Sequence, residues 1–488
     1  MKLNWKHYED KVRACWIGKN IGGTMGAPYE GKRKFLSVEG FSTQKGQVLP
    51  NDDLDLQLAW LRAVEKLGPK SITSQLLGEF WLLYITPHWN EYGIAKTNMR
   101  KGLYPPLSGE IFTTWKDSNG AWIRTEIWAC LAPGAVEVAT EYAYRDACVD
   151  HGTTGEGTVA AIFVAAMESA AFFEEDVRKL IEIGLSRIPC DSRVAKSIRT
   201  VIECYDKGLP YEQTRETVLR QNTDIGDGWF EAPSNVAYMT IGLLYGEGDF
   251  KKSMIYAINC GDDTDCTAAT LGSILGIFGV TAVIPSDWRE YIGDDIVTIS
   301  LSSGALRGIP KTCEELTERV IKLAPRMLRE NNADVELTCG ESEKSEDYVK
   351  RLLAAKGVLR RFETEKYSYT VDCLHTRATV ILEEEPKIKP LQTVKVKIRF
   401  EQNTLLNNGG GGDAEYFLDL RWWLPDGFTV KGERCVLMTH ATAHTKPMVE
   451  TEVEFTVPEK LEPLNRVVLE ISSSDKMTLG YVPINHLG

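Results

Sequence analysis

Three features that the sequence lacks narrow the kinds of protein it can encode. The 488 residues include eleven cysteines but no Cys-x-x-Cys pair. Their odd number and scattered positions predict reduced, mostly buried thiols in a cytoplasmic protein. Basic residues are not in excess, because 56 Lys and Arg stand against 69 Asp and Glu, for a net charge of −13. Such a chain repels phosphate backbones, so we expect no nucleic-acid partner. The charged start MKLNWKHYEDKVRACW lacks the apolar segment of a secretory signal, so we expect no secretory signal peptide.

Long uncharged runs are also scarce, with one exception. Residues 266–285 carry no charge, and a run of about 20 apolar residues is long enough to cross a bilayer. However, Gly272, Gly276 and Gly279, together with several Thr and Ala residues, make the run only mildly apolar, and it follows the acidic sequence DDTD directly. We therefore predict a helix buried in the core of a globular domain, and no membrane partner.

The chain divides by its hydrophobic periodicity into two parts. At about 150 residues per domain, the length predicts two or three domains. Up to about residue 330, stretches such as SQLLGEFWLLYI and VAAIFVAAMESAAFF repeat apolar residues at helical spacing. Towards the C-terminus, apolar and polar residues alternate, as in VKVKIRF and TEVEFTV. We predict an all-α domain over 1–330, a polar linker with a short helix over 331–361, and an antiparallel, immunoglobulin-like β-sandwich over 362–488.

Two acidic clusters stand at the start of predicted helices, within residues 51–55 and 262–265. One or two acidic residues at such a position serve as an N-cap and complement the helix dipole. Three carboxylates in one place repel each other, so a positive group should neutralise them. Clusters rich in oxygen and poor in sulfur and histidine suit hard divalent cations such as Mg²⁺, Mn²⁺ or Ca²⁺. From spacing alone, a metal site and a solvated acidic face both stay open.

Small residues recur at every fourth position beside both clusters. Gly18, Gly22 and Gly26 precede the first cluster, and Ala268, Gly272 and Gly276 follow within the second helix. Residues four apart share one helix face, and small side chains let two backbones approach closely. We expect the two helices to pack together and to bring the two acidic clusters into one site.

These segments, taken together, resemble a known family. GKNIGGTMGAPYEGK, NDDLDLQL, SNGAWIR, DHGTTGEGTVAA and GDDTDCTAATLGSILG occur in the order typical of the ADP-ribosylglycohydrolase family. That family includes dinitrogenase-reductase-activating glycohydrolases and jellyfish lens crystallins, and the resemblance covers about residues 10–325. It implies an all-α orthogonal bundle around two metal ions, usually Mg²⁺ or Mn²⁺. It also implies cleavage of the bond between the anomeric ribose carbon and a protein side chain, or hydrolysis of free ADP-ribose derivatives.

Carried over position by position, the resemblance implies roles for individual residues. The implied metal ligands are Asn51, Asp52, Asp53, Asp263, Asp265 and Cys266. Glu30 corresponds to a loop glutamate that closes over the metals, and Asp53 or Asp263 would accept the proton of the attacking water. The implied substrate-binding residues are Asn119, Gly120, Arg124 and His151.

Two of the implied ligands depart from the family pattern, because Asn51 and Cys266 each replace a threonine. An amide oxygen can still bind a hard cation, whereas a thiol is a poor partner for Mg²⁺. One metal position is therefore expected to be weaker, or to prefer a softer ion. No motif places an adenine-binding residue. Trp122, Trp128, Trp229 and Phe230 are stacking candidates, although tryptophan in a helical domain more often belongs to the core.

The sequence thus favours a hydrolase that uses two Mg²⁺ ions, with Mn²⁺ or Ca²⁺ as alternatives, and acts on a small-molecule or protein-linked ADP-ribosyl substrate. Two alternatives stay open at this point. One is a glycoside hydrolase for another glycoside, such as a furanoside. The other is a non-catalytic ADP-ribose-binding or crystallin-like structural protein.

Overall fold

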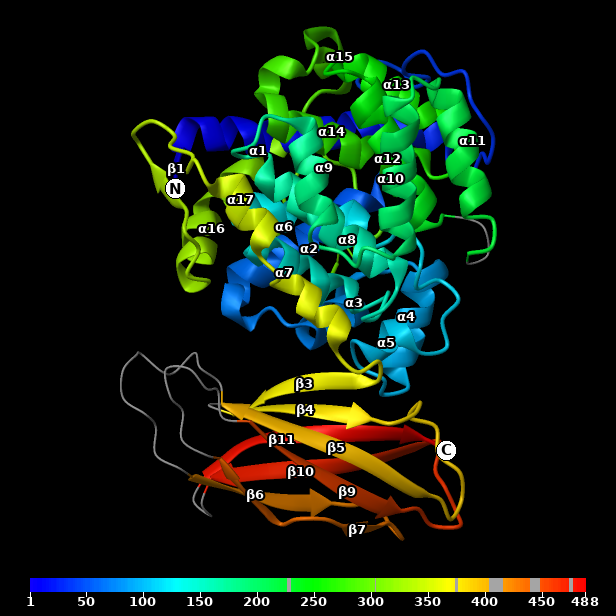
Figure 1. Cartoon of the computed structure of the whole chain (residues 1–488), viewed down its shortest axis with the longest axis vertical. Helices are drawn as coiled ribbons and strands as arrows, with labels where there is room; N and C mark the ends of the chain where they lie inside the picture. Colours follow the sequence, from blue (N-terminus) through cyan, green and yellow to red (C-terminus); the bar gives the residue numbers. More distant parts are fainter. Residues whose placement is uncertain (226–229, 303, 374–375, 403–415, 439–447, 474–476) are drawn as a thin grey trace. The chain divides into compact units, whose positions relative to one another are not determined.

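The computed structural model describes residues 1–488 except 226–229, 303, 374–375, 403–415, 439–447 and 474–476. It divides into two compact units (Figure 1). The helical unit comprises Met1–Thr97 and Ser108–Glu363, and the β unit comprises Asn98–Leu107 and Thr364–Gly488. The predicted order, a helical domain followed by an all-β one, is confirmed.

Most of the helical unit consists of α-helices, and polar side chains cap the N-termini of several of them. Asn4 illustrates a typical start, because its side chain accepts hydrogen bonds from the N–H groups of Lys6 and His7. The α-helices of the chain are α1 (Trp5–Gly26), α2 (Asp52–Leu67), α3 (Ser74–Tyr84), α4 (Asn90–Arg100), α5 (Leu107–Glu110), α6 (Glu126–Leu131), α7 (Val136–Ala147), α8 (Glu156–Ala170), α9 (Val177–Leu185), α10 (Arg193–Asp206), α11 (Tyr211–Gln221), α12 (Ala232–Tyr245), α13 (Phe250–Asn259), α14 (Thr264–Val283), α15 (Ser286–Ile292), α16 (Cys313–Glu330) and α17 (Tyr348–Ala354). The end of α4 and the first residue of α5 belong to segment 98–107 of the β unit.

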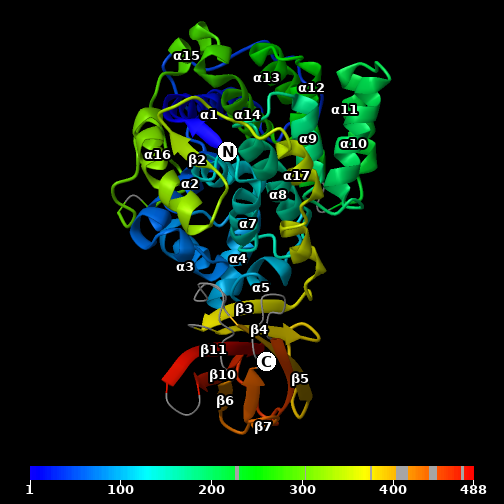
Figure 2. The same cartoon turned by 60° about the vertical axis from the view of Figure 1, so that its left-hand side comes forward.

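Helices α1 and α14 pack backbone against backbone along the two predicted stripes of small residues (Figures 1 and 2). A Cβ atom added at Gly22 would lie 2.2 Å from the carbonyl oxygen of Ala268, and one at Gly18 would lie 2.1 Å from that of Gly272. Such distances are far below van der Waals contact, so only glycine permits this approach. The predicted close packing of the two helices is confirmed.

The uncharged run forms most of α14, and its place in the fold explains its composition. This helix is long and apolar enough to cross a membrane, but 67% of its most apolar 18-residue window is buried inside the protein. Lys11 of α1 contacts this helix, because its ammonium group donates a hydrogen bond of 2.6 Å to the carbonyl oxygen of Ile277. The helix is therefore part of the core of the helical unit, as predicted.

The segment after α16 belongs to the helical unit. Its strand β2 (Glu336–Thr338) pairs in parallel with β1 (Lys2–Asn4) near the N-terminus (Figure 2). The predicted short helix is present as α17, and its Tyr348 is buried and donates a hydrogen bond of 3.1 Å to the carbonyl oxygen of Gly134. Residues 331–363 are therefore packed against the helices rather than free.

The β unit contains two antiparallel sheets with the strand orders β3-β4-β5-β9-β7 and β11-β10-β6-β8. Without β3 and β8, these orders match the ABED and GFC sheets of an immunoglobulin constant-type sandwich. Predicted alternation is seen in β5, where Val396, Ile398 and Phe400 are buried. The strands are β3 (Ser368–Cys373), β4 (Thr376–Leu382), β5 (Thr393–Gln402), β6 (Tyr416–Trp423), β7 (Thr429–Lys431), β8 (Cys435–Met438), β9 (Met448–Thr456), β10 (Leu464–Ser473) and β11 (Met477–Leu487).

Candidate active site and metal centre

The first acidic cluster forms the N-terminus of α2, where its members face different partners. Asn51 is the N-cap, and its Oδ1 accepts a hydrogen bond of 2.8 Å from the N–H group of Asp53. Asp55 accepts hydrogen bonds from the N–H groups of Ile299 and Ser300, at 2.7 and 2.5 Å. Asp52 and Asp53 are therefore the carboxylates that this cluster offers to a site. The role of Asn51 as a metal ligand stays a prediction, because its oxygen already caps the helix.

The second cluster is divided in the same way at the N-terminus of α14. Asp262 accepts a hydrogen bond of 3.2 Å from the amide of Asn235 and lies 3.8 Å from the guanidinium of Arg33. Asp263 precedes the helix, and its Oδ2 accepts a hydrogen bond of 2.6 Å from the amide of Asn119. Asp262 is thus satisfied by its own neighbours, which leaves Asp263 and Asp265 for the site.

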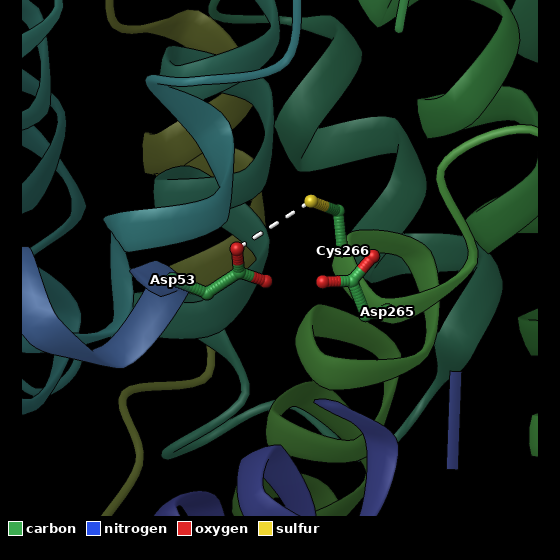
Figure 3. A group of neighbouring side chains, drawn as sticks. All are labelled: Asp53, Asp265 and Cys266. Carbon is green, nitrogen blue, oxygen red and sulfur yellow. Dashed lines mark hydrogen bonds between the residues drawn. The ribbon is translucent and has the colours of Figure 1, made fainter. Parts of the chain in front are cut away.

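The fold brings the two clusters together around Asp265. Potential ligand atoms of Asp53, Asp265 and Cys266 all lie within 4.8 Å of one another (Figure 3). A second group with the same spacing contains Glu30, Asp263 and Asp265. Asp265 is common to both groups and therefore stands between the two possible sets of ligands. Glu30 follows α1 after the short 3-10 helix at Ala27–Tyr29, so the packing of α1 on α14 helps to place it near Asp263 and Asp265.

The electrostatics of this cluster favour a bound cation. Burial raises the pKa values of Asp53 and Asp263 well above the ordinary value of an aspartate. Burial also raises the pKa of Asp52 to about 6. Repulsion from the neighbouring Asp265 carboxylate raises the pKa of Glu30 to about 8. Lys19 lies close enough to lower the pKa of Asp53, but its ammonium group already pairs with Glu126 at 2.7 Å.

Unsatisfied oxygens lead to the same conclusion. Asp53 Oδ2, Asp263 Oδ1 and Asp265 Oδ1 are buried without a hydrogen-bond partner among the described residues. A buried polar atom without a partner costs roughly 1–3 kcal/mol, and more when it is charged. Carboxylate oxygens are the donors that hard divalent cations prefer. The residues present therefore fit the divalent metal ions that the sequence predicts.

Hydrogen bonds from outside the cluster fix the orientation of two of its carboxylates. Trp122 donates to Asn119 Oδ1 at 2.9 Å, and the amide of Asn119 in turn donates to Asp263. The hydroxyl group of Tyr92 donates to Asp52 Oδ2 at 3.1 Å. Sequence analysis missed Tyr92 because it lies in α4, and no spacing relates that helix to the acidic clusters.

The remaining predicted substrate-binding residues belong to a buried polar network. The guanidinium of Arg124 donates hydrogen bonds to Asp146 at 3.0 Å and to Asp150 at 2.8 Å. His151 is fully buried, and its Nδ1 lies 3.0 Å from the carbonyl oxygen of Lys116. These contacts favour a role in holding the site over direct substrate binding. Binding of substrate by Arg124 and His151 stays a prediction.

Glu91 joins this network and was also missed by the sequence analysis. Potential ligand atoms of Glu91, Asp150 and His151 lie within 4.8 Å of one another, and burial raises the pKa of Glu91 to about 8. A Cβ atom added at Gly120 would lie 2.3 Å from Glu91 Oε1. The glycine of the Asn-Gly-x-x-x-Arg motif therefore makes room for this carboxylate.

The aromatic stacking candidates have different outcomes. Trp122 and Trp128 are fully buried core residues. Phe230 is half-buried at a backbone φ of 52°, and Trp229 lies outside the described residues. Stacking by Phe230 therefore stays a prediction, whereas the burial of the two tryptophans makes them part of the core.

Fold and site together define a helical protein whose buried carboxylates, from two helix N-termini, form a candidate metal centre. A family model described as ADP-ribosylglycohydrolase matches residues 4–327. The chain belongs to this family, and family membership indicates a glycosidase.

Two further comparisons show which known proteins this chain is similar to. An uncharacterized protein of Archaeoglobus fulgidus is 26% identical over an alignment of 309 residues that covers 59% of this chain and 92% of that protein. A solved structure titled "ADP-ribosylglycohydrolase-related protein complex" is 20% identical, with a TM-score of 0.45, and the match covers 66% of this chain and 99% of that one. The family assignment rests on the match to residues 4–327.

Proposed function

We propose that this protein is a metal-dependent hydrolase that cleaves an N- or O-glycosidic bond at a ribosyl anomeric carbon, in an ADP-ribosyl adduct or an ADP-ribose derivative. The observation that carries the proposal is the convergence of Asp53 and Asp263 on Asp265. Each of the three has a buried oxygen without a hydrogen-bond partner among the described residues. A purely structural cluster of this kind would leave several negative charges without compensation.

The metal ligands that we propose are Asp52, Asp53, Asp263 and Asp265, with Glu30 at the edge of the site. We propose two Mg²⁺ ions as the natural cofactor, with Mn²⁺ or Ca²⁺ as alternatives. When bound, such ions orient the vicinal hydroxyl groups of a ribose and make a coordinated water more acidic.

The residues of the chain would then act on charge and protons. Glycosidic cleavage passes through an oxocarbenium-like state with positive charge at the anomeric carbon, and the carboxylates of the cluster favour that charge. Asp53 or Asp263 would accept a proton from the attacking water. Asn119 would hold Asp263 for this step through its 2.6 Å hydrogen bond. Glu30 is exposed on the loop after α1, from which it would close over the substrate.

We also propose that the protein acts in the cytoplasm on a small-molecule or protein-linked substrate. Cys190 and Cys339 are free and exposed. Exposed free thiols suit a reducing compartment. The net charge of −13 argues against a nucleic-acid partner.

A substrate panel tests the proposal. Purified protein is incubated with ADP-ribosyl-arginine, an ADP-ribosyl-serine peptide, ADP-ribose derivatives and aryl furanosides, with Mg²⁺ or Mn²⁺ and after chelation. Asp191→Asn, which changes an exposed acid outside the cluster, is the control variant. We expect metal-dependent hydrolysis of at least one ADP-ribosyl compound by both proteins. Turnover of furanosides alone would contradict the proposed substrate, and no turnover of any compound would favour a non-catalytic protein.

A further inference from the structure

We propose that the thiol of Cys266 is a metal ligand, so that one position of the centre has a mixed oxygen and sulfur donor set and prefers a thiophilic divalent ion such as Zn²⁺, Co²⁺ or Cd²⁺. The other position has oxygen donors only and keeps the preference for Mg²⁺ or Mn²⁺. This inference rests on the metal centre of the proposed function, and at one of its two positions it replaces the Mg²⁺ proposed there by a thiophilic ion.

The geometry around Cys266 carries the inference. The residue lies in the first turn of α14 and is 7% exposed. Its Sγ lies 3.4 Å from Asp53 Oδ1, and the thiol donates its hydrogen bond there. Figure 3 shows the sulfur and the carboxylates of Asp53 and Asp265 around one common space. The thiol therefore occupies a place where a ligand of an ion held by Asp53 and Asp265 would stand.

A second observation points to an ion in that space. The other oxygen of Asp53 and Oδ1 of Asp265 are buried without a hydrogen-bond partner among the described residues, and the thiol satisfies neither. A free buried cysteine usually serves as a small apolar residue, yet this one lies between carboxylates. Of the eleven cysteines, all of which the structure describes, Cys266 is the one found in a group of potential metal ligands.

The two groups around Asp265 differ in the chemistry of their donors. Glu30, Asp263 and Asp265 offer carboxylate oxygens, which suit Mg²⁺, Ca²⁺ and Mn²⁺. Asp53, Asp265 and Cys266 offer a sulfur as well, and thiolate donors select Zn²⁺ and similar ions. A cysteine binds such an ion as thiolate, so the S–H proton is released to solvent when the metal–sulfur bond forms.

Cobalt absorption spectroscopy gives a readout that does not depend on activity. Chelated, reduced protein is titrated with Co²⁺, and a near-ultraviolet sulfur-to-cobalt charge-transfer band reports a thiolate ligand. The test variants are Cys266→Ser and Cys266→Thr. The matched control is Cys260→Ser, because Cys260 is another buried cysteine, whose thiol bonds to the carbonyl oxygen of Tyr256. Far-UV circular dichroism checks that each variant is folded.

We expect the band in the unchanged protein and in Cys260→Ser, and its loss in both Cys266 variants. Calorimetry should show that those variants bind Zn²⁺ more weakly by about tenfold or more, with Mg²⁺ affinity kept or increased. Binding of Co²⁺ without the band, or a band that persists in the folded Cys266 variants, would overturn the thiol ligand while leaving the metal centre intact. Failure of the unchanged protein to bind Co²⁺, Zn²⁺ or Mg²⁺ would overturn the metal centre itself.

Discussion

Gly26 ends α1 directly against the first turn of α14, so a single methyl group there should change the metal centre. A Cβ atom at this position would lie 2.3 Å from the carbonyl oxygen of Thr264 and 2.5 Å from the Cα atom of Asp265. Ordinary contact between such atoms is about 3.5 Å. Gly26→Ala should therefore push the two backbones apart by about 1 Å, and move Asp265 relative to Glu30.

The expected size of the effect follows from two opposing contributions. Alanine is favoured over glycine in a helix by about 1 kcal/mol. Overpacking in a close-packed core costs about 1–3 kcal/mol, and here the clash involves rigid backbone. We expect a net loss of about 1–2 kcal/mol in the free energy of unfolding. Because metal ligands must stay within about 0.2 Å of their ideal distances, metal affinity should fall by about tenfold or more.

Gly276→Ala is the matched control at the other end of the same helix pair. Its added Cβ would lie 2.3 Å from the carbonyl oxygen of Ala14, which is an equally severe clash. At 1.5 Å per residue, Gly276 lies about 16 Å along α14 from Asp265. Calorimetric titration with Mg²⁺ and Mn²⁺, together with thermal unfolding of the chelated proteins, should show similar losses of stability but a large loss of affinity only for Gly26→Ala. Unchanged metal affinity in a destabilised Gly26→Ala protein would refute the link between helix packing and the site.

Three further predictions concern charge, the buried network and the chain boundary. Folding raises the pKa of Asp52 to about 6 and that of Glu30 to about 8. The metal-free native state then holds protons that the unfolded chain has released, and the free energy of unfolding should fall from about pH 4 to pH 8. Saturating Mg²⁺ should weaken this trend, whereas metal-free stability that rises over this range in denaturant titrations would contradict it. Asp150→Ala removes one of the two carboxylates that pair with the buried Arg124 and leaves Asp146. It should cost up to about 3–5 kcal/mol in urea unfolding, whereas loss of an exposed acid in Asp191→Ala should leave the midpoint almost unchanged. A chain ending at residue 330 lacks β2 and α17 and should melt at a lower temperature than one ending at 363; equal melting temperatures would show that these contacts add nothing.

Local patterns in the sequence were sufficient to predict several features of this fold. Helical spacing located the core helices, and alternation located strands such as β5. Glycines at four-residue spacing predicted the contact between α1 and α14, because a glycine without a Cβ atom lets the two backbones touch directly.

Local spacing could not predict which carboxylates of each acidic cluster face the site and which accept hydrogen bonds from other segments. Asp55 and Asp262 look like additional site carboxylates, but segments distant in the sequence donate hydrogen bonds to them. Residues 299–300 donate to Asp55 Oδ2, and Asn235 donates to Asp262. For the same reason, the sequence analysis missed Tyr92 and Glu91. It also missed that residues 98–107 belong to the β unit, where Asn485 donates a hydrogen bond to the carbonyl oxygen of Gly102. Each of these contacts depends on tertiary structure.

Metal content of Asp265→Ala tests the central claim most directly. Asp265 belongs to both groups of potential ligands. In two-metal sites the cations lie about 3.5–4 Å apart, so loss of this carboxylate would leave less negative charge between them and increase their repulsion. Elemental analysis of protein purified without chelator should show two ions per unchanged chain. Asp265→Ala should hold at most one and should show no hydrolysis, with a native far-UV spectrum. Full metal content and full activity in Asp265→Ala would contradict the two-metal account.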